Sequence, residues 1–210
     1  MKRAVLVCNG SVSTKQLYST ISREDFLIAV DGGANKLVKT RFVPDLVIGD
    51  MDSINKAALR RFRQCSFLRF PREKPELDLE LALSYCAGNR FHEVLVLGAI
   101  GTRADMSLTN IFLLSGVPEG IDAKIVHDGQ EIFLMRKGRV LHGVPGERIS
   151  IFPIGGDARC VTLTGFRYAL SSRDVPFGLG LGLSNEFISK KAKVSFKSGM
   201  LLCVHFHDWF

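Results

Sequence analysis

The chain has 210 residues, of which 46% are hydrophobic and 23% are charged, with a formal net charge of +7. This composition is typical of a globular protein and excludes collagen-like, intrinsically disordered and disulfide-scaffold classes. No apolar run approaches the roughly 18 residues that a membrane span needs. The run after Met1-Lys2-Arg3 is too short for a signal peptide, and the cysteines form no Cys-x-x-Cys pair. We therefore expect a cytoplasmic protein with reduced thiols and no membrane partner.

Up to about residue 128, short apolar runs alternate with helical patterns. Strands are expected at residues 4–8, 26–30, 46–48, 67–70, 94–97 and 124–126. Helices are expected between them, at residues 34–40, 54–62, 78–86 and 107–114. Nearly continuous apolar strands separated by helices indicate a parallel sheet that is covered on both faces. The pattern predicts an N-terminal α/β domain over residues 1–128.

From residue 129 the pattern changes to short runs rich in Val, Ile, Leu and Phe, separated by turns that contain glycine. Strands are expected at residues 131–135, 139–142, 148–152, 161–164, 193–196 and 201–206, and no helix of normal length fits. This pattern predicts a smaller C-terminal antiparallel β-sandwich or barrel over residues 129–210. His205 and His207 share one face of the last strand, and we interpret them as packing or surface groups rather than ligands.

The positive charge is concentrated in the C-terminal part. Residues 1–128 carry 17 Lys and Arg against 15 Asp and Glu, whereas residues 129–210 carry 11 against 6. A basic balance favours polyanionic ligands, either phosphorylated small molecules or nucleic acid. The densest basic cluster comprises Arg60, Arg61, Arg63, Arg69, Arg72 and Lys74. It carries no recognisable nucleic-acid motif, so we interpret it as a solvated helix face and strand flank and expect no nucleic-acid partner.

Acidic residues follow several predicted strands of the α/β domain. Asp31 follows the strand at 26–30, Asp50 and Asp52 follow the strand at 46–48, Asp78 opens a helix, and Asp105 lies after the strand at 94–97. Asp31, Asp78 and Asp105 each also suit a turn or a helix N-terminus. Asp50 and Asp52 favour a functional role more strongly, because two acids and the Ser53 hydroxyl crowd the end of one strand. Ligands of open parallel sheets bind at the carboxyl ends of the strands, and crowded carboxylates are tolerated there when a cation holds them. Hard oxygen ligands in this number suit Mg²⁺ together with substrate phosphates.

Two further features fit a phosphate ligand. Gly32 and Gly33 precede a predicted helix and would supply backbone amides to a phosphate group. Arg103 adds a planar cation that suits phosphate oxygens.

Taken in order, the motifs resemble those of the bacterial-type thiamine pyrophosphokinases over nearly the whole chain. They are DGGAN at 31–35, PDLVIGDMDS at 44–53, EK at 73–74, DLELA at 78–82, GTRAD at 101–105 and GLSNEF at 182–187. The resemblance implies transfer of a pyrophosphoryl group from ATP to the hydroxyethyl oxygen of thiamine, giving thiamine diphosphate and AMP. It also implies a Mg²⁺ cofactor and a homodimer in which the β-domain helps to bind thiamine near the subunit interface.

The resemblance also assigns roles by motif position. Asp50, Asp52 and Asp78 resemble the catalytic carboxylates that organise Mg²⁺ and phosphate. Asp31, with Gly32 and Gly33, resembles part of the nucleotide site. We assign Arg103 to the same site because its guanidinium suits phosphate oxygens. Asp105 resembles the acid that faces thiamine, and Ser184 and Asn185 resemble the polar contacts to its pyrimidine. Residues 1–128 are then an ATP- and Mg²⁺-binding catalytic domain, and residues 129–210 a domain for thiamine binding and dimerisation.

Two positions depart from the family pattern. Leu77 stands where the family usually has a Thr, just before the acid that matches Asp78. Met106 stands where the family usually has a His or another polar residue, just after the acid that matches Asp105. Neither change removes a carboxylate, so we expect an effect on rate or fine geometry rather than on the type of reaction. Two alternatives stay open: a pyrophosphokinase for another heterocyclic alcohol such as a pterin, and a non-catalytic protein that binds thiamine or nucleotide in the same pocket.

Overall fold

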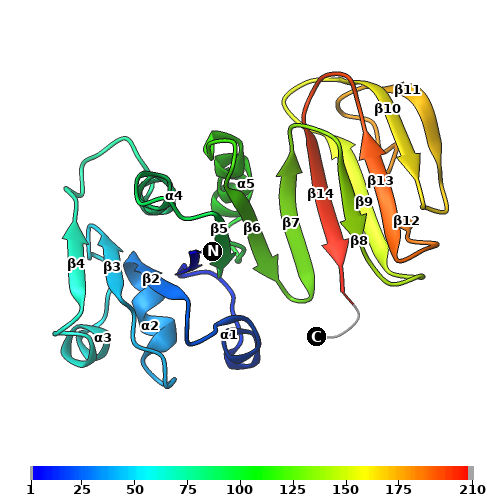
Figure 1. Cartoon of the computed structure of the whole chain (residues 1–210). Helices are drawn as coiled ribbons and strands as arrows, with labels where there is room; N and C mark the ends of the chain where they lie inside the picture. The colour runs from blue at the N-terminus through cyan, green and yellow to red at the C-terminus, as the bar shows by residue number, and fades with distance from the viewer. Residues whose placement is uncertain (1, 208–210) are drawn as a thin grey trace. The chain divides into compact units, whose positions relative to one another are not determined.

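The structure of the protein is a computed structural model that describes residues 2–207. The chain divides into two compact units, Met1–Asp128 and Gly129–Phe210. The first unit is α/β and the second is all-β, which confirms the predicted fold class (Figure 1). Among residues 2–207, no helix is long and apolar enough to cross a membrane.

The first unit is built on a parallel sheet in the order β6-β5-β1-β2-β3-β4. Its strands are β1 (Arg3–Val7), β2 (Phe26–Val30), β3 (Leu46–Gly49), β4 (Ser66–Arg69), β5 (Glu93–Leu97) and β6 (Asp122–His127). The chain runs outward from β1 to β4 and then returns to β5 on the other side of β1. The strand order therefore reverses between β1 and β5, which is where open α/β sheets place their ligands.

Helices cover both faces of this sheet. Helices α1 (Thr14–Thr20), α2 (Ala34–Leu37) and α3 (Lys56–Arg61) lie on one face, and α4 (Asp78–Gly88) and α5 (Ala104–Leu113) lie on the other (Figure 1). Leu17, Leu37 and Ala58 from the first three helices pack in one core cluster with alternate strand residues such as Val5 and Val47. Because the strands bury both faces, their sequences read as continuous apolar runs, and this is why they were predictable.

Helix α1 was missed by the sequence analysis because its pattern is mostly polar. Only Gln16 and Leu17 of its residues are buried. The start of α1 is marked by an N-cap residue, Ser13, whose side chain accepts a hydrogen bond of 3.1 Å from the Gln16 backbone N–H. A Ser followed three residues later by Gln is a recognised helix-start pattern.

The second unit is a sandwich of two antiparallel sheets, in the orders β12-β9-β14-β7 and β11-β10-β13-β8. The strands are β7 (Gln130–Met135), β8 (Arg139–His142), β9 (Arg148–Pro153), β10 (Ala158–Thr164), β11 (Leu170–Val175), β12 (Asn185–Glu186), β13 (Lys191–Ser195) and β14 (Leu201–Phe206). Ile149 and Cys203 of one sheet share a core cluster with Val161 and Val194 of the other. Strands β11 and β12 were not predicted, because β11 is polar and largely exposed and β12 has only two residues.

Candidate active site

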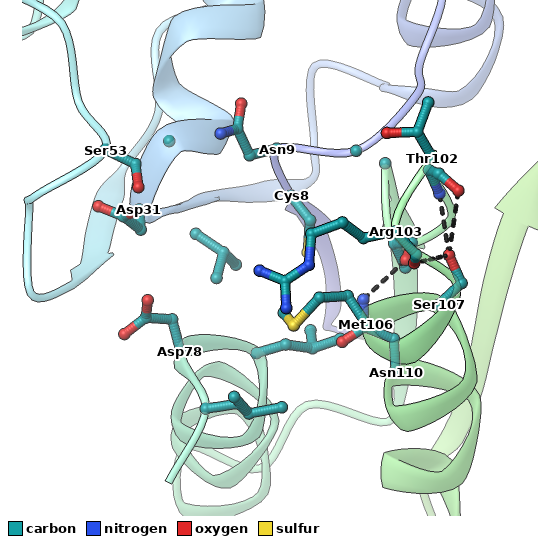
Figure 2. A pocket seen from close by; sticks show the side chains of 18 of the residues that line it. Cys8, Asn9, Asp31, Ser53, Asp78, Thr102, Arg103, Met106, Ser107 and Asn110 are labelled. Carbon is teal, nitrogen blue, oxygen red and sulfur yellow. Dashed lines mark hydrogen bonds between the residues drawn. The ribbon is translucent and has the colours of Figure 1, made fainter. Parts of the chain in front are cut away.

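A pocket of about 400 Å³ opens at the carboxyl ends of β1, β2 and β5 (Figure 2). It is lined by residues 8–10, 30–32, 52–53, 77–79, 98–99, 101–103, 106–107 and 110. The pocket therefore occupies the point at which the strand order reverses, and its volume suits a small ligand.

Three carboxylates converge beside this pocket. Asp31 follows β2, Asp50 follows β3 and Asp78 begins α4. One carboxylate oxygen from each of the three lies within 4.8 Å of the other two. Gly49 makes this convergence sterically feasible, because a Cβ at that position would lie only 2.9 Å from the Asp31 Cβ and 3.2 Å from the Asp78 Cγ. Its φ of +144° is also one that glycine adopts without strain.

Asp31 is the most buried member of this group. Its Oδ1 is buried and finds no hydrogen-bond partner within residues 2–207, and its backbone lies in the left-handed region with a φ of +41°. Burial raises the pKa of Asp31, the nearby charges of Asp78 and Asp50 add to the rise, and hydrogen bonds from Gly32 and Ser53 oppose it. A buried acceptor without a partner among like charges fits a divalent cation, which would satisfy the oxygen and offset the repulsion.

Lys74 is a site residue that the sequence analysis missed. Its Nζ lies 2.9 Å from Asp78 Oδ1 and 4.0 Å from Asp50 Oδ2, and its side chain is only 10% exposed. Burial alone lowers the pKa of Lys74, but the hydrogen bond and charge of Asp78, with the charges of Asp50 and Asp31, raise it overall. The assignment of Lys74 to a solvated basic cluster was therefore wrong. The available signal was the EK pair at residues 73–74, which is one of the motifs that carry the family resemblance.

Asp50 and Asp52 occupy different positions although they are two residues apart. Asp50 Oδ1 accepts a hydrogen bond of 3.0 Å from the Asp52 backbone N–H, which closes a turn after β3. Asp52 lines the pocket, but its side chain is 42% exposed and its Oδ2 lies 3.2 Å from Arg72 Nε. The structure thus groups Asp31, rather than Asp52, with Asp50 and Asp78.

The two glycines after Asp31 differ in position. Gly32 lines the pocket, whereas a Cβ on Gly33 would lie 1.8 Å from the Val7 carbonyl oxygen, so Gly33 permits close contact between this turn and β1. The helix that follows is α2, which has four residues instead of the seven predicted and is preceded by a 3₁₀ turn at Asp31–Gly33. Because α2 is so short, its helix dipole would attract a phosphate only weakly. The expected contact between backbone amides and a phosphate therefore depends on the turn itself.

Arg103 extends over the pocket from the side opposite Asp31 and Asp78 (Figure 2). Its Nε lies 3.2 Å from Asp105 Oδ1, and its Nη2 bonds to Asp105 Oδ2. This pairing lowers the pKa of the Asp105 carboxyl and raises that of the Arg103 guanidinium. Both side chains are largely exposed, and Asp105 lies outside the pocket lining.

Ser184 and Asn185 belong to the second unit. The Asn185 side chain is buried and holds the backbone of Tyr168: its Oδ1 accepts from the Tyr168 N–H at 2.9 Å, and its Nδ2 donates to the Tyr168 carbonyl at 2.8 Å. Ser184 is exposed, has a φ of +52°, and donates its backbone N–H to Ser150 Oγ at 3.1 Å. Asn185 therefore shapes this segment, and Ser184 is the member whose side chain faces solvent.

Two other lining residues were not assigned a role from the sequence. Asn110 donates from Nδ2 to the Ala99 carbonyl at 2.7 Å, while its buried Oδ1 has no hydrogen-bond partner within the described residues. Cys8 also lines the pocket, but burial, with a smaller contribution from the charge of Asp78, raises the pKa of its thiol to about 12. A thiol that stays protonated at neutral pH is a poor nucleophile.

Comparison with known proteins identifies the family. Residues 17–126 match the Thiamin pyrophosphokinase catalytic domain, and residues 139–201 match the Thiamin pyrophosphokinase vitamin B1 binding domain. The thiamine pyrophosphokinase of Bacillus subtilis strain 168 is 31% identical over 186 residues, which is 86% of this chain and 87% of the relative. This chain belongs to the thiamin pyrophosphokinase family. It is a thiamine diphosphokinase, which transfers pyrophosphate from ATP to the hydroxyethyl group of thiamine.

Solved structures of the family agree with this fold. The crystal structure of Bacillus subtilis thiamine pyrophosphokinase superposes with a TM-score of 0.88 at 27% identity, covering 99% of this chain and 100% of the other. The yeast thiamin pyrophosphokinase structure superposes with a TM-score of 0.82 at 16% identity, covering 98% of this chain and 86% of the other. At that lower identity the likeness shows the fold alone.

Both departures from the family pattern lie in the pocket lining. Leu77 occupies the N-cap position of α4 with φ −74° and ψ 151°, and its side chain makes no capping hydrogen bond there. A Thr at this position in the thiamin pyrophosphokinase pattern would carry a hydroxyl able to cap the helix whose first residue is Asp78. Met106 lies in the first turn of α5 and also lines the pocket (Figure 2).

Proposed function

We propose that the pocket at the carboxyl ends of β1, β2 and β5 binds the polyphosphate of ATP through Mg²⁺, and that Asp31, Asp50 and Asp78 hold the ion. The supporting observation is the convergence of these carboxylates, with one oxygen of each within 4.8 Å of the others, and the buried Asp31 Oδ1 has no hydrogen-bond partner within residues 2–207. The donor set is all oxygen, which suits Mg²⁺ in combination with substrate phosphates. Asp52 lines the same pocket and is kept as the fourth candidate carboxylate.

Mg²⁺, when bound, would neutralise the negative charge that builds up on the polyphosphate as AMP departs. Lys74 holds a positive charge between Asp78 and Asp50, and Arg103 presents a guanidinium from the other side of the pocket. Arg103 is thus placed to neutralise phosphate oxygens, whereas Lys74 offsets part of the charge of the carboxylates that it contacts. A carboxylate of the same group could accept the proton of the thiamine hydroxyl, a step worth about 10²–10⁴-fold in rate.

We further propose that the second unit contributes thiamine binding and dimerisation, with Ser184 and Asn185 in the segment that meets the pyrimidine and Asp105 facing thiamine. Support comes from the match of residues 139–201 to a vitamin B1 binding domain. Several large apolar side chains near this segment are exposed, among them Tyr168, Leu183 and Ile188, as expected of a surface that a partner subunit covers. The five cysteines are free thiols, which favours a reducing cytoplasm.

The variants Asp50→Asn and Asp52→Asn test the metal assignment. In both, we expect the fold to persist. Thiamine-dependent release of AMP should fall by at least about 100-fold in Asp50→Asn, because a charged metal ligand is lost. A smaller loss in Asp52→Asn would place Asp52 outside the ion's direct ligands. Turnover close to wild type in Asp50→Asn would refute the assignment.

Substrate profiling tests the choice of acceptor. With ATP and Mg²⁺ present, AMP release should require thiamine and should not be supported by a pterin alcohol. Calorimetry that shows tight thiamine binding without any turnover would instead favour a non-catalytic binding protein, for which Leu77 and Met106 are the sequence support.

A further inference from the structure

The interior face of one sheet in the second unit ends in residues that commonly bind metals. On β14, Leu201 and Cys203 face the core, and His205 and His207 continue the same face at two-residue spacing. On β9, Ile151 and Ile149 face the core, and Glu147 comes two residues earlier in the same alternation. In the antiparallel register His205 pairs with Ile149. Two residues further along β14 and two residues back from Ile149, the same register places His207 opposite Glu147.

The side chains of these residues meet. His205 Nε2 lies 3.0 Å from Glu147 Oε2, and His207 Nδ1 lies 3.7 Å from Glu147 Oε1. The two imidazole ring centroids are 4.0 Å apart. One ligand atom from each of the three residues falls within a common 4.8 Å limit. Bonds of about 2.0–2.1 Å from Zn²⁺ to tetrahedral ligands place those ligands about 3.3 Å apart, so the measured spacings need only small side-chain adjustments.

Burial makes this cluster unusual. The side chains of Glu147, His205 and His207 are 5%, 6% and 11% exposed. A carboxylate taken out of water must be paired or must bind a cation. A single proton shared between the Glu147 carboxylate and an imidazole is one way to compensate the buried charge. A divalent cation held by all three side chains is the other, and one ligand atom from each of them lies within 4.8 Å of the others.

We propose that Glu147, His205 and His207 form a binding site for a divalent transition metal ion, with Zn²⁺ as the expected ion. Two imidazole nitrogens and one carboxylate oxygen are a ligand set that Zn²⁺ uses, with the remaining position taken by water. The set contains nitrogen and so differs from the all-oxygen group of Asp31, Asp50 and Asp78, which suits Mg²⁺. The proposal does not depend on the catalytic assignment, because the two groups share no residue.

The surrounding contacts match those that orient metal ligands. The Val144 backbone N–H donates to Glu147 Oε2 at 2.8 Å, which fixes the carboxylate. His207 Nε2 lies 3.8 Å from Glu131 Oε2, on the strand next to β14, so Glu131 could receive the ring N–H that the metal does not use. The Phe187 ring packs at 5.0 Å from the His205 ring, which shields the cluster from water.

A bound ion would stabilise the segment that carries Ser184 and Asn185. The Glu147 carbonyl accepts the Phe187 backbone N–H at 3.0 Å, and the Phe187 carbonyl accepts the Gly146 N–H at 2.8 Å. Glu147 thus links the ion directly to Phe187, the residue that follows β12. We expect Zn²⁺ to raise the unfolding temperature of the protein, because an ion that binds only the folded state stabilises it.

The experiment uses the full chain without a histidine tag, freed of metal by chelator and then titrated with Zn²⁺ by calorimetry. We expect one Zn²⁺ per chain with a Kd of about 1 µM or tighter, and a rise in unfolding temperature. Co²⁺ in place of Zn²⁺ should give the visible absorption of a tetrahedral nitrogen and oxygen site. Glu147→Gln keeps an acceptor for Val144, and His207→Gln keeps a polar group at the less buried position; each should weaken Zn²⁺ binding by about 100-fold or more.

Two control variants separate this site from others. His142→Gln removes an exposed histidine of β8 in the same unit, and Asp50→Asn removes a carboxylate of the other candidate metal group. Both should bind Zn²⁺ as the wild type does. The proposal is overturned if the folded wild type binds no stoichiometric Zn²⁺, or if Glu147→Gln and His207→Gln bind it unchanged. Either result would show that shared protons and hydrogen bonds, rather than a metal ion, hold Glu147, His205 and His207 together.

Discussion

Asp31→Asn should make the protein more stable and far less active. The substitution keeps the shape of the side chain, and Asn tolerates the φ of +41° at this position. Two unit charges 4.8 Å apart repel by about 1 kcal/mol in water and by about 3 kcal/mol at an effective dielectric constant of about 20. Removing the charge of Asp31 relieves its repulsion with Asp50 and Asp78 but gives up attraction to Lys74. We expect a net gain of about 1–2 kcal/mol in the free energy of unfolding without divalent metal.

Thermal unfolding with and without Mg²⁺ measures this effect. In EDTA, Asp31→Asn should unfold a few degrees above wild type. Added Mg²⁺ should stabilise wild type more than the variant, because the variant lacks one carboxylate of the group. Thiamine-dependent AMP release should drop by at least about 100-fold. Asp128→Asn is the matched control: Asp128 lies in the same unit, has a φ of +43° and is 69% exposed, so neither stability nor turnover should change much.

The pH dependence has a defined sign. Because burial raises the pKa of Asp31, the folded state binds this proton more tightly than the unfolded state does. Metal-free wild type should therefore lose stability as the pH rises from the ordinary carboxyl range through the raised pKa, and Asp31→Asn should lack that component. The reasoning is refuted if Asp31→Asn is less stable than wild type in EDTA, or if it retains both the wild-type Mg²⁺ response and wild-type turnover.

Further predictions concern single contacts. Leu77→Thr should supply the missing cap of α4 and raise the free energy of unfolding by about 1 kcal/mol in urea titrations; an unchanged midpoint would contradict this capping argument. Gly33→Ala should lower the free energy of unfolding by more than about 3 kcal/mol, because the new Cβ would lie 1.8 Å from a carbonyl oxygen. Gly88→Ala has open space around its Cβ and should leave the free energy of unfolding unchanged or raise it by up to about 1 kcal/mol. Equal urea midpoints for the two variants would refute the steric argument. Arg103→Gln should raise the pKa of the Asp105 carboxyl toward its ordinary value in an NMR titration, and no change would show that the pair does not form in solution.

Local chemistry made much of the fold predictable. The strand at 26–30 and the strands at 139–142 and 201–206 begin and end where expected, because continuous apolar runs and the glycine turns beside them depend on neighbouring residues alone. The convergence of acids was also predictable in outline, since parallel strands bring their carboxyl ends to one edge of a sheet.

Long-range contacts decided the composition of the site. Asp50 and Asp52 look equivalent in the sequence, yet the turn after β3 directs Asp52 toward Arg72 and solvent. Asp31 joins the acid group because Gly49, distant along the chain, leaves room for it. Lys74 looked like part of a basic surface and instead lies between two carboxylates.

The family resemblance, the change from α/β to all-β and the residue types available for phosphate and metal chemistry could be inferred from the amino-acid sequence, because each depends on short motifs and local periodicity. Which side chains meet could be known only from the folded chain. Glu147 is 58 residues from His205, and no local pattern reports that β9 and β14 pair in the register that joins them. Side-chain proximity across a sheet depends on register and turn geometry, which are set by the packing of the whole unit.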